Sequence, residues 1–261
     1  MSAPSPPQRE IRKVAVAFDP VCAGPALLEI GSRLASSLGA ELEALLLVDE
    51  DMSRFSDLQF GRMFEPHSGK SAQFDRSALN THRAGALART RAMLRRLSEN
   101  HRMTCTAREF SAASLVETSA ATSGELLVIA SRQTKFGGRA SVDTEAVRIA
   151  VHSARSVLLV SDQQSMSRHV VVVRDQSPVG QRASLIAQVI AASEGLDDDG
   201  LASEISVGGE DAGALADRIK SLRPTLLVMG LKDAETAGAL HDRIDNSTCS
   251  VLFVRSPELE A

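Results

Sequence analysis

The chain has 261 residues, of which 43% are hydrophobic and 24% are charged, and its formal net charge at pH 7 is −4. This length accommodates two ordinary domains with apolar cores. Aromatic residues make up only 3% of the chain, with no Trp or Tyr, so the sequence does not favour the stacking surfaces typical of single-strand nucleic-acid binders. The acidic balance also gives no general attraction to nucleic acid, so we expect no nucleic-acid partner.

The N-terminal residues, 1–11, are rich in Pro and Ser, and we expect a disordered tail there. No apolar run reaches the roughly 18 residues of a membrane span, and no signal-peptide pattern occurs, so we expect a cytoplasmic protein without membrane insertion. Cys22, Cys105 and Cys249 lie far apart, which favours free thiols. The six histidines form no i, i+4 pair, so we expect no metal. We also expect no cofactor.

Short apolar runs alternate with helical patterns through the first 163 residues. The runs lie at 14–18, 42–48, 126–130 and 157–160, and the helical patterns at 25–38, 82–100, 112–122 and 142–153. This alternation predicts an α/β fold of parallel βαβ units. Because the runs are continuously apolar, we expect sheets covered on both faces.

The same pattern restarts after residue 168. Strand 170–173 is followed by Arg174 and Asp175, as strand 14–18 is followed by Asp19, and segments 224–230 and 250–254 echo 124–130 and 156–160. Three matching strands in the same order indicate an internal duplication, with domains at 12–163 and 168–257. The second domain has room for only one further strand, 204–208, and one helix, 211–222. We therefore expect it to be truncated by one βα unit.

These features resemble the universal stress protein family in a tandem form. The shared features are a first strand ending in Asp19, a second running through Val48, a fourth leading into a polar loop, and a helix entering Ser-Val-Leu-Leu-Val at 156–160. The resemblance implies two flavodoxin-like domains with strand order 3-2-1-4-5 and a crevice between strands one and four. It also implies that the fifth strands, 157–160 and 251–254, pair across a two-fold as a pseudo-dimer. We expect two parallel sheets, not one continuous sheet.

ATP-binding members of the family carry Gly-x2-Gly-x9-Gly-(Ser/Thr) after strand four. The glycines let backbone N–H groups approach phosphate, and the last pair begins a helix whose N-terminus attracts anions. The four motif positions fall on Ala130, Gln133, Asp143 and Thr144. A carboxylate at position 143 would repel phosphate by about 4 kcal/mol at ~4 Å and an effective dielectric of ~20. In the second copy Gly230 remains, but the loop is too short and places Ala237 and Gly238 at the last two positions. We therefore expect no ATP binding by this motif.

The resemblance implies a set of ligand-contacting candidates at the strand ends. They are Asp19, Val48, Ala130, Arg132 and Thr144. For Asp19 and for Asp175 the alternative is capping of the following turn. Gly137 and Gly138, flanked by Lys135 and Arg139, are either an anion-binding nest or a surface loop.

Two segments are candidates for partner contacts. Segment 52–74 holds four of the eight phenylalanines, and we expect it to cover or rim the crevice, the alternative being packing on its own core. The helix near 82–102 has Leu87, Leu94 and Leu97 as its buried stripe and many arginines elsewhere, either solvated or docking on acidic residues such as 197–199. The contact candidates are Phe55, Phe60, Phe64, Arg91 and Arg95.

Nothing in the chain indicates catalysis, because no nucleophile elbow and no paired base or metal ligands occur in the sequence. We expect a non-catalytic stress-response or regulatory protein that acts on an unidentified protein partner or as a homodimer. The alternative is a nucleotide or small-ligand sensor that uses a remodelled crevice between strands one and four of the first domain.

Overall fold

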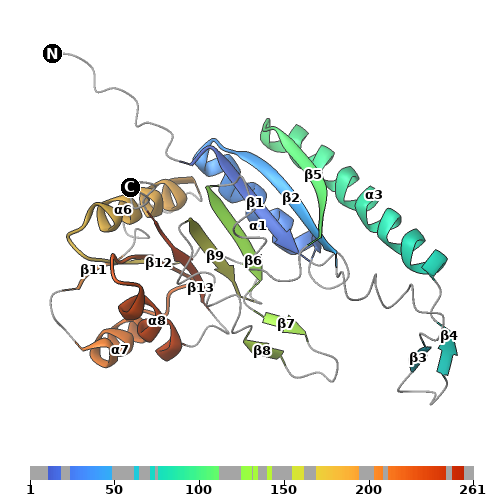
Figure 1. Cartoon of the computed structure of the whole chain (residues 1–261). Coiled ribbons are helices and arrows are strands. Elements are labelled where there is room, and N and C mark those ends of the chain that lie inside the picture. Colours follow the sequence, from blue (N-terminus) through green and yellow to red (C-terminus); the bar gives the residue numbers. More distant parts are fainter. Residues whose placement is uncertain are drawn as a thin grey trace, which may run out of the picture.

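The structure is a computed structural model that describes residues 11–18, 24–48, 62–64, 71–73, 76–111, 125–130, 132–134, 140–142, 155–161, 169–193, 203–207, 211–244 and 249–255. Its main sheet has nine strands in the order β11-β10-β12-β13-β9-β6-β1-β2-β5 (Figure 1). These strands are β1 (Lys13–Phe18), β2 (Glu41–Val48), β5 (Cys105–Ser111), β6 (Leu126–Ala130), β9 (Ser156–Val160), β10 (Val170–Arg174), β11 (Ser203–Ser206), β12 (Leu226–Gly230) and β13 (Ser250–Phe253).

The strand order agrees with the fold class expected from the sequence. In residues 13–160, the first half, the order is β5-β2-β1-β6-β9, which is 3-2-1-4-5. In residues 170–253, the second half, the order is β11-β10-β12-β13, the same arrangement without its third strand. The domain boundaries at 163 and 168 stay a prediction.

The expectation of two separate sheets is wrong, because β9 and β13 pair and join them. Their pairing is antiparallel, with Leu158 opposite Leu252 and Val157 opposite Phe253, whereas the neighbouring pairs β6–β9 and β12–β13 are parallel. The expected contact between the fifth strands is therefore confirmed. An unpaired strand edge would leave backbone N–H and C=O groups without partners, so pairing is the favourable outcome.

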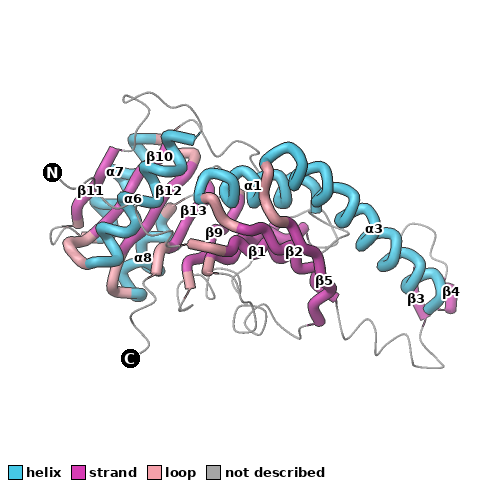
Figure 2. The backbone as a smooth tube through the Cα atoms, turned by 90° about the horizontal axis from the view of Figure 1, so that it is seen from above, coloured by secondary structure: helices cyan, strands magenta, loops and turns pink. Residues whose placement is uncertain are grey.

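Five helices are described, and they cover the sheet from two sides (Figure 2). One side carries α1 (Gly24–Leu38), α3 (Arg76–His101) and α6 (Pro178–Ser193); the other carries α7 (Ala212–Leu222) and α8 (Ala234–Arg243). None of these described helices is long and apolar enough to cross a membrane.

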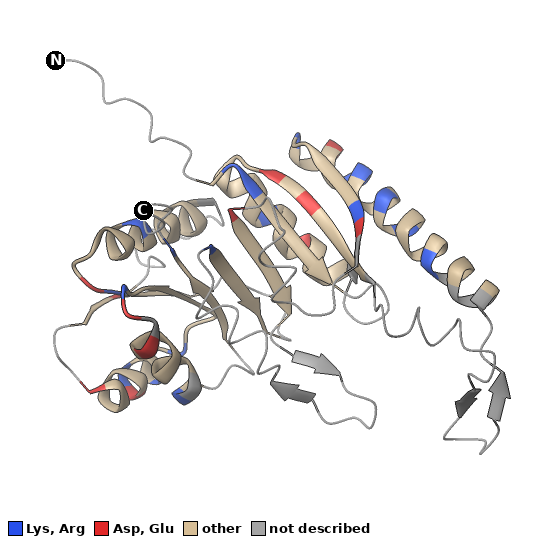
Figure 3. Ribbon diagram, viewed as in Figure 1, with Lys and Arg blue, Asp and Glu red and all other residues tan. Residues whose placement is uncertain are grey.

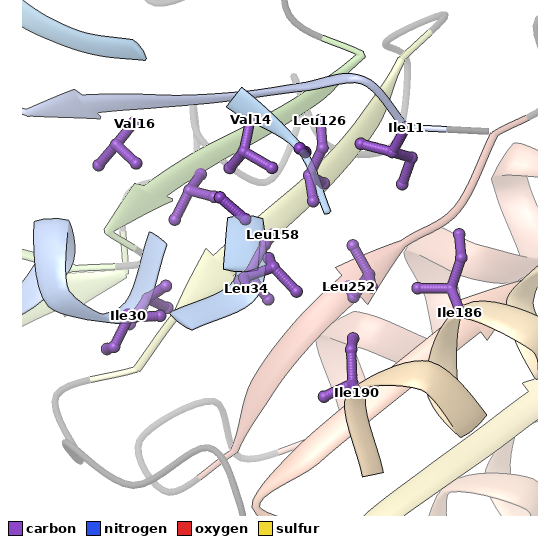
Figure 4. Packing of buried hydrophobic residues seen from close by; sticks show 14 of the residues in the cluster. Ile11, Val14, Val16, Ile30, Leu34, Leu126, Leu158, Ile186, Ile190 and Leu252 are labelled. Carbon is purple, nitrogen blue, oxygen red and sulfur yellow. The ribbon is translucent and has the colours of Figure 1, made fainter. Parts of the chain in front are cut away.

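The core runs without a break across the β9–β13 seam. Val14 and Leu34 of the first half share one buried cluster with Leu252 and Ile186 of the second, and Leu158 lies between them (Figure 4). On the opposite side of the sheet a second cluster also contains strand residues of both halves. The two halves are therefore packed as one body of apolar side chains.

Several expected boundaries need correction. Ile11, which we assigned to the tail, is 3% exposed and belongs to the core. Val142, expected to begin a helix, ends strand β8 (Ala140–Val142). The rest of that helix, and the one expected at 112–122, lie outside the described residues. The sequence of strand β5 is not a continuous apolar run, so this strand was not predicted.

Candidate functional site

The carboxyl ends of β1, β2 and β6 define the expected crevice in the first half. Phe18, the last residue of β1, lies opposite Leu46, and β2 ends two residues later at Val48. On the other flank of β1, strand β6 ends at Ala130. The structure thus brings the ends of the strands carrying Val48 and Ala130 to the same edge. Asp19 and Thr144 lie outside the described residues.

The chain after β6 forms a hairpin. Strand β7 (Arg132–Thr134) pairs antiparallel with β8, so that Arg132 lies opposite Val142 and Gln133 opposite Ser141. Lys135, Gly137, Gly138 and Arg139 lie outside the described residues, between these two strands in sequence. The motif position at Gln133 is therefore part of a β ladder. The backbone N–H and C=O groups of a residue in a β ladder point towards the neighbouring strand. In the glycine-lined loop of the family motif, the backbone N–H groups point towards phosphate instead.

In the second half, Asp175 links the end of β10 to the loop after β12. One carboxylate oxygen, Oδ1, accepts hydrogen bonds from the backbone N–H of Ser177, at 3.0 Å, and from its hydroxyl. The other, Oδ2, accepts from the backbone N–H of Lys232 at 3.0 Å, on the loop after β12. The structure supports the capping interpretation of Asp175. In addition, the hydrogen bond from Lys232 links the end of β10 to the loop after the neighbouring strand β12.

These contacts also act on the acidity of Asp175. Partial burial raises the pKa of this carboxyl, but the hydrogen bonds from Ser177 and Lys232 outweigh burial, and the net pKa is lowered from 3.8. Asp175 is therefore ionised at neutral pH and holds two loops through its charge.

Helix α6 packs closely on the same strand ends. A Cβ atom added to Gly230 would lie 2.4 Å from the Cβ of Ala183 and 2.8 Å from the carbonyl oxygen of Val179. A Cβ atom added to Gly180 would lie 2.2 Å from the carbonyl oxygen of Asp175. The N-terminal turn of α6 thus rests directly on the ends of β10 and β12, and Gly230 serves helix packing.

The N-terminus of α8 is occupied by the chain's own carboxylate. Asp233 accepts from the backbone N–H groups of Glu235, at 3.2 Å, and Thr236, at 3.0 Å. Ala237 and Gly238, expected at the last two motif positions, lie inside α8 and not at its start. Asp233 was not among the predicted site residues, although an Asp directly before a helical pattern is a recognisable N-cap signal.

The partner-contact candidates on α3 are placed as expected from its periodicity. Leu94 and Leu97 are buried and Leu87 packs partly buried against the core, which confirms the apolar stripe. Arg91 and Arg95 are exposed. Asp197, Asp198 and Asp199, the expected acidic counterpart, lie outside the described residues.

The described part of segment 52–74 does not lie over the crevice. It is a hairpin of β3 (Arg62–Phe64) and β4 (Ser71–Gln73), beside the N-terminal end of α3 and away from β1 and β6 (Figures 1 and 2). Phe64 ends β3, whereas Phe55 and Phe60 lie outside the described residues. The described residues of this segment therefore do not form the expected lid over the crevice.

Among the residues that the structure describes, no three His, Cys, Asp or Glu gather as metal ligands. Cys105 and Cys249 are free thiols. Burial raises the pKa of Cys249 to about 12, so this thiol stays protonated at neutral pH and is a poor nucleophile.

No family model and no curated protein sequence matches this chain. Solved structures do match it over nearly its whole length. A universal stress protein from Archaeoglobus fulgidus DSM 4304 has a TM-score of 0.57 at 10% identity, over 95% of this chain and 97% of that one. A Pseudomonas aeruginosa UCBPP-PA14 protein named for the same family has 0.55 at 13% identity, over 96% and 95%. A functionally unknown protein from Pseudomonas aeruginosa PAO1 has 0.55 at 12%, over 96% and 94%. By its strand order and by these neighbours, the chain has the fold of the universal stress proteins.

Proposed function

We propose that the protein is a non-catalytic regulator in a stress response, that it acts through protein contacts, and that it does not bind ATP through the family motif. One observation carries the proposal. In the second half, the backbone N–H groups that a phosphate would use are taken by carboxylates of the chain, Asp175 on Lys232 and Asp233 on Glu235 and Thr236. An incoming phosphate would have to displace two anions that already hold these donors.

The first half supports the same proposal from its sequence. Ala130 and Gln133 replace motif glycines, and Gln133 lies in the β7–β8 ladder. We also infer a tandem two-domain arrangement from the recurring strand order, and a cytoplasmic location from the free thiols of Cys105 and Cys249, which suit a reducing compartment.

Calorimetry with ATP and Mg²⁺ on the full chain tests the proposal. We expect no binding in the micromolar range. A 1:1 isotherm with a dissociation constant below about 10 µM, roughly −7 kcal/mol, would contradict it. ATP turnover by the purified chain would contradict the non-catalytic part separately.

A small-ligand sensor is the second candidate, and one contrast between the halves favours it. Ala130, at the end of β6, is partly exposed, whereas Gly230, its counterpart at the end of β12, is buried against α6. The crevice of the first half is thus less closed at this position. Native mass spectrometry of gently purified protein tests this function: a co-purified ligand supports it, and a bare chain argues against it.

A further inference from the structure

We propose that the exposed arginines of α3 bind an extended acidic segment of a partner protein, with Arg91 and Arg95 as the central contacts. This inference rests on the proposed function, since it assumes that the protein acts through protein contacts. It adds the surface that is used and the chemistry of the partner.

Helix α3 reverses the charge of the chain locally. Its 26 residues include six arginines and one acidic residue, Glu99, whereas the whole chain has 29 basic and 33 acidic residues. Figure 3 shows the blue bands along α3 with a single red band near its C-terminal end. Like charges at i, i+4, such as Arg91 and Arg95, destabilise an isolated helix by a few tenths of a kcal/mol. A helix face selected only for solubility would mix the two signs.

Most of these charges have no counterion within the described structure. Arg83 pairs with Glu109 of β5, with 3.2 Å between Nη2 and Oε2. By contrast, Arg89, Arg91, Arg95 and Arg96 are exposed and form no ion pair with any residue that the structure describes. Arg91 and Arg95 are four residues apart and share one face of α3, whereas Arg89 and Arg96 lie on another face, so Arg91 and Arg95 are the pair that one external segment can contact.

The spacing of the arginines fits an extended polypeptide. Arg91 and Arg95 are one turn apart, about 6 Å along the helix axis. An extended chain places every second side chain on the same side, about 6.8 Å apart. Alternate acidic residues of a partner can thus face successive turns of α3. Guanidinium groups bind carboxylates with two parallel hydrogen bonds, which gives the contact directional specificity.

The observations favour an acidic protein segment over nucleic acid. Nucleic-acid-binding domains with a basic patch commonly have an isoelectric point above 9, whereas this chain has about 5.9 and no Trp or Tyr for stacking.

The acids that the structure describes in the second half offer little to the arginines of a second copy of this chain. Most described acids of its second half are engaged internally. Asp175, Asp211 and Asp233 cap turns or helices, and Glu204 pairs with Arg174.

Fluorescence anisotropy with the full-length protein tests the surface. The probe is a labelled peptide of about twelve residues with alternating Glu and Ser, compared with its Gln-Ser analogue and a short DNA duplex at near-physiological salt. We expect the Glu-Ser peptide to bind at least about tenfold more tightly than the Gln-Ser peptide and the duplex. The double variant Arg91→Gln/Arg95→Gln should weaken Glu-Ser binding by about tenfold. The matched control Lys220→Gln/Lys232→Gln removes two exposed lysines and should change it by less than about twofold.

Three results would overturn the proposal: equal binding of the two peptides, tighter binding of the duplex, or an unchanged affinity in the Arg91/Arg95 variant. The comparison of peptides on the unaltered protein needs no variant, so misfolding of a variant leaves the proposal testable. ATP binding in calorimetry would contradict the proposed function but not the peptide result, which separates the two failures.

Discussion

At the residue scale, Asp175 makes structural hydrogen bonds at a position where the resemblance implies a ligand contact. The resemblance places an aspartate after strand one near a bound nucleotide, yet Asp175 uses its oxygens on Ser177 and Lys232. From the sequence, both capping and ligand contact were open for Asp175. The sequence could not show the contact with the Lys232 N–H, because that group lies 57 residues away along the chain. Only folding brings these groups together.

Replacing Asp175 with Ala should destabilise the protein by about 1–2 kcal/mol, because two backbone donors lose their acceptor. The folded pKa of Asp175 lies below 3.8. The contribution is therefore present above pH 3.8 and is lost as the pH falls through the folded pKa. Urea unfolding of both proteins from pH 7 to pH 3 measures this difference.

The control for this measurement is Asp217→Ala. That carboxylate is 81% exposed and lies 3.9 Å from Lys220, so its removal should change stability by less than about 0.5 kcal/mol. A stability difference for Asp175→Ala that grows below pH 4 would contradict the role given to its charge.

Gly230 is the second residue whose role only the structure shows. Substitution Gly230→Ala should cost about 1–3 kcal/mol, because the new Cβ would meet Ala183 at 2.4 Å on a packed helix. In contrast, a Cβ at Gly85 of α3 would meet only the end of Arg89, at 3.4 Å. Gly85→Ala should therefore stabilise the helix by up to about 1 kcal/mol. Thermal unfolding of both variants checks the opposite signs.

At the element scale, a repeated pair of serine contacts closes the two ends of the β9–β13 seam. Ser156 begins β9, and its hydroxyl oxygen accepts from the backbone N–H of Arg255 at 3.1 Å. Ser250 begins β13, and its hydroxyl oxygen accepts from the backbone N–H of Ser161, also at 3.1 Å. The first residue of each fifth strand, a serine in both halves, thus accepts a hydrogen bond from a backbone N–H just beyond the end of the strand it pairs with.

Ser156→Ala and Ser250→Ala should each cost about 1–3 kcal/mol, because each leaves a backbone N–H at the seam without its acceptor. The two serines lie at opposite ends of the strand pair, so the double variant should show the sum within about 0.5 kcal/mol. Denaturant unfolding measures this, with the exposed Ser221→Ala as control. A strongly non-additive double variant would mean that the two ends are coupled.

Within the described residues, the edge at β11 is more polar and more exposed than the matching part of the first half. With Val14 aligned on Val170, the buried Leu28 and Ser32 of α1 correspond to Ser184 and the exposed Gln188 of α6. Likewise, Ala44 of β2 corresponds to Glu204 of β11, which hydrogen-bonds Ser184 at 3.4 Å. In the first half α3 packs against α1, and polar residues replace that cover in the second half. The described residues at the β11 edge of the second half therefore form a polar surface.

At the scale of the whole molecule, the continuous core predicts that the two halves unfold together. Leu252 is 1% exposed and belongs to the cluster that joins α1 to α6. Leu252→Ala should lower the unfolding free energy by about 2–5 kcal/mol in both halves, because the cavity lies at their junction. Hydrogen exchange measured on β1 and on β10 tests this.

The exposed Leu185→Ala on α6 is the control, and it should leave both strands unchanged, since Leu185 is already 54% exposed. Loss of protection in β10 alone after Leu252→Ala would mean that the halves unfold independently, in agreement with separate domains and against a single cooperative unit.

The sequence by itself determined the strands that are buried on both faces and the missing unit of the second half. These follow from local apolar runs and from their repetition, which the chain carries irrespective of its fold. Tertiary structure decided the rest. Strand β5 is an edge strand whose Arg108 contacts Glu43 at 3.0 Å, so it needs no apolar run. The fusion into one sheet and the closure around Asp175 depend on hydrogen bonds between residues far apart in sequence, and only folding brings such groups within bonding distance.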